Sequence, residues 1–248
     1  MYSGIPGTAA PVFPRLRALA AAENVCYDVG KRGNTVKDFP FFATEYGVAG
    51  LIRKEIPYRG EAYIRIREAV PGAAEQLVEE CAAFCRLAGA ERVYTQGHPE
   101  LSERPLHTVM LEMRGTAWVD AQKLACLFPV TEGTVARWRQ LCNEAMRPVD
   151  NAATLETRDE EDILREPGAY FIHDNGQLLG IGWLRDGTLQ TVAAMRRGAG
   201  ERVMHTMMSL AEGEPIRLEV ASTNRRAIRL YERLGFVTVG EKSRWYCL

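Results

Sequence analysis

The hydrophobic positions of the chain alternate between stretches with a helical period and stretches with a strand period. The clearest helix is predicted over Ala73–Ala88, where apolar side chains recur every three or four residues. Gly89 follows at the position where a helix commonly ends. The predicted inward stripe of this helix consists of Leu77, Cys81, Phe84 and Cys85.

Strict alternation predicts strands elsewhere. In Ala62–Val70 the residues Ile64 and Ile66 fall on one face and polar or aromatic residues on the other. Two tight turns, Asp174-Asn175-Gly176 and Arg185-Asp186-Gly187, predict hairpins between the strands that flank them. The pattern therefore mixes antiparallel hairpins with helices.

The remaining elements follow from the same two periods. Further strands are predicted at Phe41–Glu45, Val48–Ile56, Glu91–Thr95, His107–Met113, Leu127–Val130, Ala169–His173, Gln177–Leu184, Thr188–Ala193, Ile216–Val220, Phe236–Val239 and Arg244–Cys247. Further helices are predicted at Arg15–Glu23, Thr134–Met146, Asp159–Arg165, Glu201–Ala211 and Asn224–Leu234, after a loose Gly-, Pro- and Ala-rich arm at Met1–Pro14.

The order of elements repeats once along the chain: each half reads as a strand meander, then a helix, then a strand. The break falls between Gly115 and Lys123, so we expect an N-terminal domain at residues 1–118 and a C-terminal domain at 119–248. The expected fold class is α/β (α+β): two mixed, mostly antiparallel sheets in tandem, flanked by helices.

Composition narrows the functional classes. The 248 residues are 46% hydrophobic and 25% charged, which is ordinary for a globular protein and excludes a disordered or collagen-like chain. A net charge of −1 argues against a nucleic-acid binder. No apolar run approaches the roughly 20 residues of a membrane span. With no signal peptide at the start, we expect a cytoplasmic protein without membrane association.

Metal chemistry is not expected. The six cysteines and four histidines are scattered, and none of the cysteines forms a CxxC pair. Cys81 and Cys85 lie one helical turn apart, which is a poor geometry for a disulfide. Free, buried thiols are therefore the interpretation we adopt.

One segment carries a chemical signal. The strand Thr188–Ala193 leads into Arg196-Arg197-Gly198-Ala199-Gly200 and then into a helix. A strand, a Gly-rich loop and a helix N-terminus form a cradle for a phosphate, because the first N–H groups of a helix are unpaired and its dipole attracts anions. Arg202 adds positive charge beside the loop. The alternative is that the glycines only permit a tight turn.

The following residues decide between these interpretations. After the strand Ile216–Val220 come Asn224, Ala227 and the run Leu230-Tyr231-Glu232-Arg233-Leu234-Gly235-Phe236. This arrangement resembles the GNAT superfamily, the Gcn5-related N-acetyltransferases, over about Leu127–Leu248. The N-terminal half resembles a degenerate GNAT-like repeat or a cap. Met195 departs from the family, whose loop usually begins with Gln or Arg.

The resemblance implies acetyl-CoA, or another acyl-CoA, as cosubstrate and no metal. Its pyrophosphate would lie on the amides of the Gly loop, its pantetheine arm would pair with the strand before the loop, and Asn224 would lie near that arm. The implied donor-binding residues are Val192, Ala193, Ala194, Arg197, Gly198, Ala199, Gly200, Glu201, Asn224 and Ala227.

The resemblance also implies two catalytic residues. Glu219 would take a proton from the attacking amine, and Tyr231 would protonate the departing thiolate. For Glu219 the alternative is an ordinary surface carboxylate, and for Tyr231 it is packing of a helix residue in the core. The implied activity is transfer of an acetyl or other acyl group to an amine by direct attack. The alternative is an inactive CoA-binding or interaction module.

The N-terminal half has a weaker version of the loop. Val70-Pro71-Gly72-Ala73-Ala74 stands at the corresponding position, but Pro71 lacks an N–H and no arginine lies beside it. We expect this half to bind no CoA and to wall off the acceptor; the alternative is a plain packing partner. The candidate wall residues, for which a solvated or half-packed position is the alternative, are Tyr46, Arg53, Tyr58, Arg59, Tyr63 and Arg65. The expected partner is a small-molecule or peptide amine, and the expected state is a monomer or homodimer.

Overall fold

The computed structural model describes residues 41–116, 118–165, 168–211 and 213–248. The arm predicted at Met1–Pro14 and the helix predicted at Arg15–Glu23 lie outside these residues.

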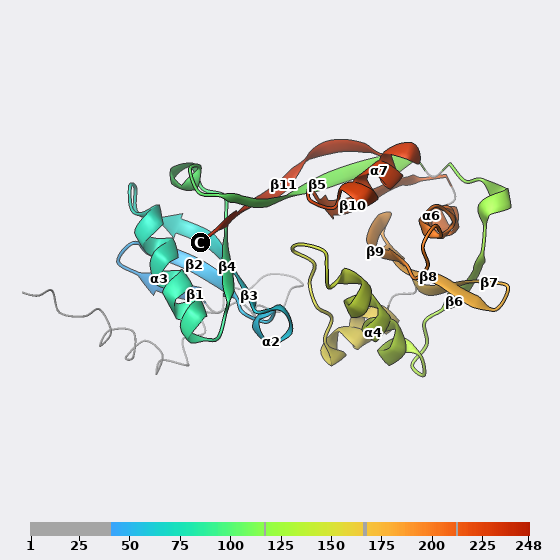
Figure 1. Cartoon of the computed structure of the whole chain (residues 1–248), viewed down its shortest axis with the longest axis horizontal. Coiled ribbons are helices and arrows are strands. Elements are labelled where there is room, and N and C mark those ends of the chain that lie inside the picture. Colours follow the sequence, from blue (N-terminus) through green and yellow to red (C-terminus); the bar gives the residue numbers. More distant parts are fainter. Residues whose placement is uncertain (1–40, 117, 166–167, 212) are drawn as a thin grey trace, which may run out of the picture.

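The strands of the described residues join in one eleven-stranded sheet with the order β1-β2-β3-β4-β11-β5-β10-β9-β8-β7-β6 (Figure 1). Neighbouring strands are antiparallel, except that β3 is parallel to β4 and β9 is parallel to β10. The strands are β1 (Phe41–Thr44), β2 (Gly47–Ile52), β3 (Glu61–Ala69), β4 (Arg92–Gln96), β5 (Leu106–Thr116), β6 (Cys126–Pro129), β7 (Ala169–Asp174), β8 (Gln177–Arg185), β9 (Thr188–Ala194), β10 (Pro215–Ala221) and β11 (Val237–Cys247).

Helices flank this sheet. The α-helices are α2 (Ile56–Arg59), α3 (Ala74–Leu87), α4 (Val135–Met146), α5 (Glu160–Arg165), α6 (Gly200–Met208) and α7 (Arg225–Arg233). Short 3-10 turns occur at η2 (Pro99–Leu101), η3 (Ala121–Lys123), η4 (Thr157–Asp159) and η5 (Ser209–Ala211). Helix α3 connects the parallel strands β3 and β4, and α6 connects β9 and β10, so each half contains one βαβ unit.

The two halves exchange strands. β5, from the N-terminal half, lies between β10 and β11, while β11, the last strand, lies between β4 and β5. Figure 1 shows β5 and β11 running from one half to the other as a single arch, with β10 beside β5. The expected tandem sheets are thus one continuous sheet, and the hydrogen bonds of this arch hold the halves together.

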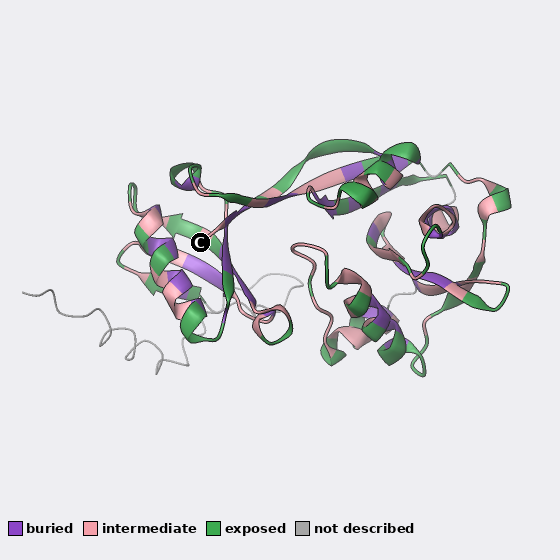
Figure 2. Cartoon of the chain, in the orientation of Figure 1, coloured by how far each residue is buried: buried purple, intermediate pink, exposed green. Residues whose placement is uncertain are grey.

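Three main cores lie on the faces of the sheet, and Figure 2 shows buried residues along the helices that cover them. The α3 core includes Leu77, Cys81 and Cys85, all fully buried as the helical period predicts. One side of the C-terminal half packs against α6 and α7, and the opposite side packs against α4 around Trp138. The C-terminal part of the sheet therefore lies between two cores.

The sequence prediction of fold class is confirmed: the protein has a mixed, mostly antiparallel sheet flanked by helices. Asn175 and Asp186 adopt the left-handed backbone that the two hairpin turns require. The two closing strands were predicted wrongly, because β11 is one strand whose pairing is interrupted by bulges. Helix α2 was missed. The predicted boundary at residues 118–119 lies in the connection from β5 to β6 and stays a prediction.

Candidate functional site

The parallel strands β9 and β10 are paired only where they begin. Thr188 and Leu189 lie in register with Arg217 and Leu218, and no later pair forms between the two strands. In the pairing of β9 with β8, Gln190 is an extra residue between two register positions, which makes a β-bulge at the point of separation. Beyond this bulge, the backbone of β9 has no strand partner on the side that faces β10. An extended ligand could hydrogen-bond to the main chain there. The sequence pattern did not reveal this bulge.

The turn from β9 into α6 has the backbone of an anion cradle. Gly198 has a φ of +87°, and no heavy atom lies within 4 Å of where its Cβ would stand. The N–H of Ala199 donates to Arg196 O at 3.2 Å, and the N–H of Val203 donates to Ala199 O at 2.9 Å. By contrast, the N–H groups of Gly198, Gly200 and Glu201 donate to none of the described residues. They are free to bind an anion, which the helix dipole also favours.

The arginines around this turn do not all face it. Arg202 donates to Asp174 Oδ2 at 2.6 Å, so it ties α6 to the β7–β8 hairpin. Arg196 donates to Gln177 Oε1 at 2.6 Å. Arg197 makes no hydrogen bond or ion pair with the described residues. Of the three arginines, only Arg202 is thus paired with a carboxylate among the described residues, since Gln177 is a neutral amide. Arg197 is available for a phosphate.

The other predicted donor-binding residues lie along the same path. Val192 packs toward the α6–α7 core and Ala193 toward the α4 core, so their backbones run between the two. Ala194, the last residue of β9, is exposed. The Glu201 side chain contacts Lys123 Nζ at 2.5 Å, and this ammonium lowers the pKa of Glu201. The side chain of Glu201 thus faces η3, and only its backbone N–H remains to bind the acyl donor.

Asn224 caps helix α7. Its Oδ1 accepts a hydrogen bond from the N–H of Ala227 at 3.2 Å. This bond explains why Asn suits the start of the helix, and it occupies the Ala227 N–H. The predicted donor contacts of both residues stay predictions beside this observed role.

Tyr231 lies on α7 within the α6–α7 core. Its side chain is 8% exposed, and its ring centroid is 5.9 Å from that of Phe236. Burial raises the pKa of Tyr231 to about 12, because the phenolate would be poorly solvated there. Its hydroxyl makes no hydrogen bond with the described residues. The phenol is therefore protonated at neutral pH.

Glu219 lies on β10 with its side chain 53% exposed, and Lys242 Nζ stands 4.0 Å from its Oε1. Its neighbours Leu218 and Val220 pack in the core that holds Tyr231. Because side chains alternate along a strand, Glu219 faces the opposite side of the sheet. The structure therefore places the two predicted catalytic residues on adjacent elements but on different faces of the sheet.

The corresponding turn of the N-terminal half already holds an anion. Glu100, in η2, accepts from the N–H of Gly72 at 2.9 Å and from the N–H of Ala74 at 3.0 Å. These two backbone bonds lower the pKa of the Glu100 carboxyl. Gly72 has a φ of +79°, close to that of Gly198. No local pattern marks Glu100, because it lies 26 residues beyond Ala74 in the chain.

Cys81, Cys85 and Cys142 are free, buried thiols, and burial raises the pKa of each. In the part of the chain that the structure describes, no group of three His, Cys, Asp or Glu side chains is arranged to hold a metal ion. None of the described helices has both the length and the apolar character of a membrane span.

The comparison with known proteins agrees with this architecture. Residues 135–236 match the sequence model of the acetyltransferase (GNAT) family, and no curated protein matches the chain. The matched segment runs from α4 to the residue before β11. It therefore includes the separated strands, the turn at Gly198 and Tyr231.

Solved structures share the fold at low identity. A GCN5-related N-acetyltransferase from Anabaena variabilis superimposes with a TM-score of 0.56 at 12% identity, covering 86% of this chain and 63% of that one. A functionally unknown conserved protein from Staphylococcus epidermidis gives 0.54 at 11% identity, covering 85% and 93%. A GCN5-related N-acetyltransferase from Kribbella flavida gives 0.52 at 12% identity, covering 82% and 57%. The similarity of this chain to the GNAT acetyltransferase family thus extends from residue 135 to residue 236.

Proposed function

We propose that the protein is an acyl-CoA-dependent N-acyltransferase that moves an acetyl group from acetyl-CoA to an amine of a small molecule or peptide. The observation that carries this proposal is the separation of β9 from β10, followed by a helix N-terminus whose amides at Gly198, Gly200 and Glu201 have no partner among the described residues. We infer that the unpaired strand edge and the anion cradle together form one donor groove.

Each part of acetyl-CoA would bind one of these features. Its pyrophosphate would accept from the free amides of the turn and pair with Arg197. Its pantetheine amides would bond to the backbone of residues 192–194, beyond the bulge at Gln190. Side chains matter little along this stretch, because the contacts are with the main chain.

The reaction needs one proton removed and one supplied. The neutral amine nitrogen attacks the thioester carbon, a C–N bond forms, and the C–S bond breaks as the intermediate collapses. Glu219, directly or through water, takes the proton that the amine loses. Tyr231 gives its proton to the thiolate sulfur and recovers one from solvent. A pKa of about 12 keeps Tyr231 protonated at neutral pH.

Donor binding and turnover are tested separately. Acetyl-CoA at 100 times its dissociation constant should stabilise the native state by about 2.7 kcal/mol, which a thermal melt detects. Release of free thiol with a panel of amines measures transfer. The proposal fails if acetyl-CoA neither raises the melting temperature nor releases thiol with any amine.

Two substitutions test the assigned roles. Tyr231→Phe and Glu219→Gln should each lower kcat by about 100-fold or more while donor binding persists. Glu241→Gln is the matched control for the second, because Glu241 has a similarly exposed side chain, 51% against 53%. If neither substitution changes the rate of acyl transfer while donor still binds, the mechanism is wrong.

A further inference from the structure

A cavity of about 520 Å³ lies between the two halves, away from the turn at Gly198. Its lining comes from residues 56–61, 89, 91 and 92 of the N-terminal half and from residues 147, 148 and 150, which follow α4 in the C-terminal half. Tyr58 and Arg59, two of the wall residues predicted from sequence, are among the lining. Residues of both halves therefore form this cavity.

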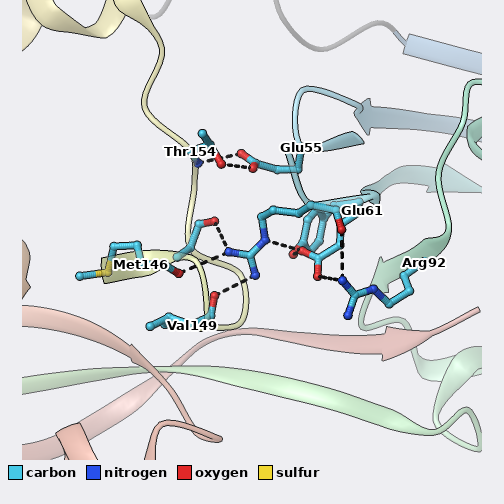
Figure 3. A network of polar contacts seen from close by, with 9 residues as sticks. Glu55, Glu61, Arg92, Met146, Val149 and Thr154 are labelled. Atoms are coloured by element: carbon cyan, nitrogen blue, oxygen red, sulfur yellow. Dashed lines mark hydrogen bonds and ion pairs between the residues drawn. The ribbon is translucent and has the colours of Figure 1, made fainter. Parts of the chain in front are cut away.

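Charged side chains of the N-terminal half fix the loop that forms one wall of this cavity, and Figure 3 shows their contacts with that loop. The Arg59 guanidinium donates to the carbonyl oxygens of Met146 at 3.4 Å, Val149 at 3.0 Å and Ala152 at 3.5 Å. Glu55, only 3% exposed, accepts from the N–H of Thr154 at 2.9 Å and from its Oγ1 at 2.6 Å. Two N-terminal side chains thus hold the loop after α4 in one conformation.

Some of the charges in the cavity are already neutralised. Glu61 accepts from Arg59 at 2.8 Å and from the Tyr63 hydroxyl at 2.7 Å, and Arg92 lies 3.2 Å from its other oxygen. By contrast, Arg147 and Glu91 form no hydrogen bond or ion pair through their side chains with the described residues. The cavity therefore offers a guanidinium and a carboxylate that have no internal partner.

Asp150 connects this cavity with the strand separation. Its Oδ2 accepts from the Thr223 hydroxyl at 2.6 Å, which leaves Oδ1 for another donor. Thr223 lies two residues after the end of β10, at the end where β9 and β10 are apart, and directly precedes the cap of α7. One wall of the cavity is thus attached to the mouth of the proposed donor groove.

We propose that this cavity binds the acceptor, and that the acceptor is an amine that also carries an anionic group such as a carboxylate. Asp150 receives the ammonium end near the strand separation, and Arg147 receives the anionic end. This assignment rests on the proposed acyl transfer and adds to it the class of acceptor.

Matched acceptors test the assignment. Amino acids and the corresponding amino acid amides differ in the carboxylate, so we expect KM to be at least tenfold lower for the acids. Arg147→Gln should remove that difference and leave the KM for acetyl-CoA unchanged. Arg137→Gln is the control, because Arg137 is an exposed arginine of α4 that has no ion pair among the described residues. Equal use of acids and amides by the native enzyme overturns the proposal.

A second pair of variants separates charge from structure. Asp150→Asn removes the carboxylate charge, whereas Thr223→Val removes only the hydrogen bond that Asp150 accepts. We expect the first to raise the KM of amino acids tenfold or more and the second to change it by less than about threefold. If Thr223→Val has the larger effect, Asp150 is a structural residue and the assignment is wrong.

Calorimetry in the presence of CoA distinguishes this site from the proposed activity. Amino acids that bind, and bind more weakly to Arg147→Gln, support the site even if no thiol is released, and that result counts against acyl transfer alone. Thiol release that is as fast with amides as with acids supports acyl transfer and refutes the site. If amino acids neither bind nor react, the site is refuted.

Discussion

A single methyl group at Gly180 should disturb both the stability of the protein and its affinity for the donor. Gly180 lies on β8, and a Cβ there would stand 2.5 Å from Ala193 O and 2.6 Å from Val203 Cγ2. The first atom belongs to the backbone of β9, and the second to a fully buried, β-branched residue of α6. Neither can give way alone, so Gly180→Ala must shift β9 and α6 together.

The expected cost is that of an overpacked core, about 1–3 kcal/mol. At about 2–4 °C per kcal/mol for a protein of this size, the melting temperature should fall by roughly 2–12 °C. Because the displaced segments carry the proposed pantetheine and pyrophosphate contacts, the KM for acetyl-CoA should rise, by about tenfold for a loss of 1.4 kcal/mol.

Thermal melts and thiol-release kinetics measure the two effects. The matched control is Gly240→Ala, because a Cβ at Gly240 meets no heavy atom within 4 Å. That variant should stay within about 0.5 kcal/mol of the native protein. If Gly180→Ala has the melting temperature of the native protein and an unchanged KM for acetyl-CoA, the reasoning is wrong, because the close approach of β8, β9 and α6 would then not support the donor groove.

Three further outcomes follow from other contacts. Glu100→Gln should lower the melting temperature at pH 7. Because folding lowers the pKa of Glu100, its carboxylate stabilises the protein above the ordinary carboxylate pKa of about 4.3, and this stabilisation is lost as the pH falls through the lower, folded-state pKa. The melting temperatures of the two proteins should therefore converge in acid. Arg59→Met leaves the buried Glu61 carboxylate without its main partner and should cost about 3–5 kcal/mol by chemical denaturation, whereas Arg104→Met, at a more exposed pair, should cost about 1 kcal/mol or less. Fragments 1–118 and 119–248 should each fail to give a cooperative thermal melt, and mixing them during refolding should restore one; a cooperative melt of either fragment alone would contradict the role of the exchanged strands.

Features that depend on local sequence could be predicted. The inward stripes of α3 and α4, the two hairpin turns and the Gly198 turn all follow from periods or turn residues within about fifteen positions. The exchange of β5 and β11 could not be predicted, because it pairs segments more than a hundred residues apart and each segment also reads as a strand of its own half. Pairing partners are set by the whole fold, not by local alternation.

In the candidate site, too, only the features that depend on local sequence could be predicted. Gly198 and the helix after it could be recognised, because a turn and a helix start leave local signals. The engagement of Arg202 by Asp174 could not, since nothing in the sequence separates a cation that faces a ligand from one that pairs inside the protein. The hold of Arg59 on three carbonyl oxygens likewise involves backbone groups, which every residue has and no motif marks.

The two βαβ units show why one chain with a repeated architecture would carry a single donor site. Both turns place a glycine in the left-handed region before a helix, and both thereby expose N–H groups. In the first turn the Glu100 carboxylate takes two of those donors, and a phosphate would have to displace a tethered anion to enter. In the second turn no described carboxylate does so, and Arg197 remains available. The N-terminal half thus has a similar turn, but its own side chain fills the cradle. It also supplies β5 to the sheet, and it holds the wall of the proposed acceptor cavity through Glu55 and Arg59.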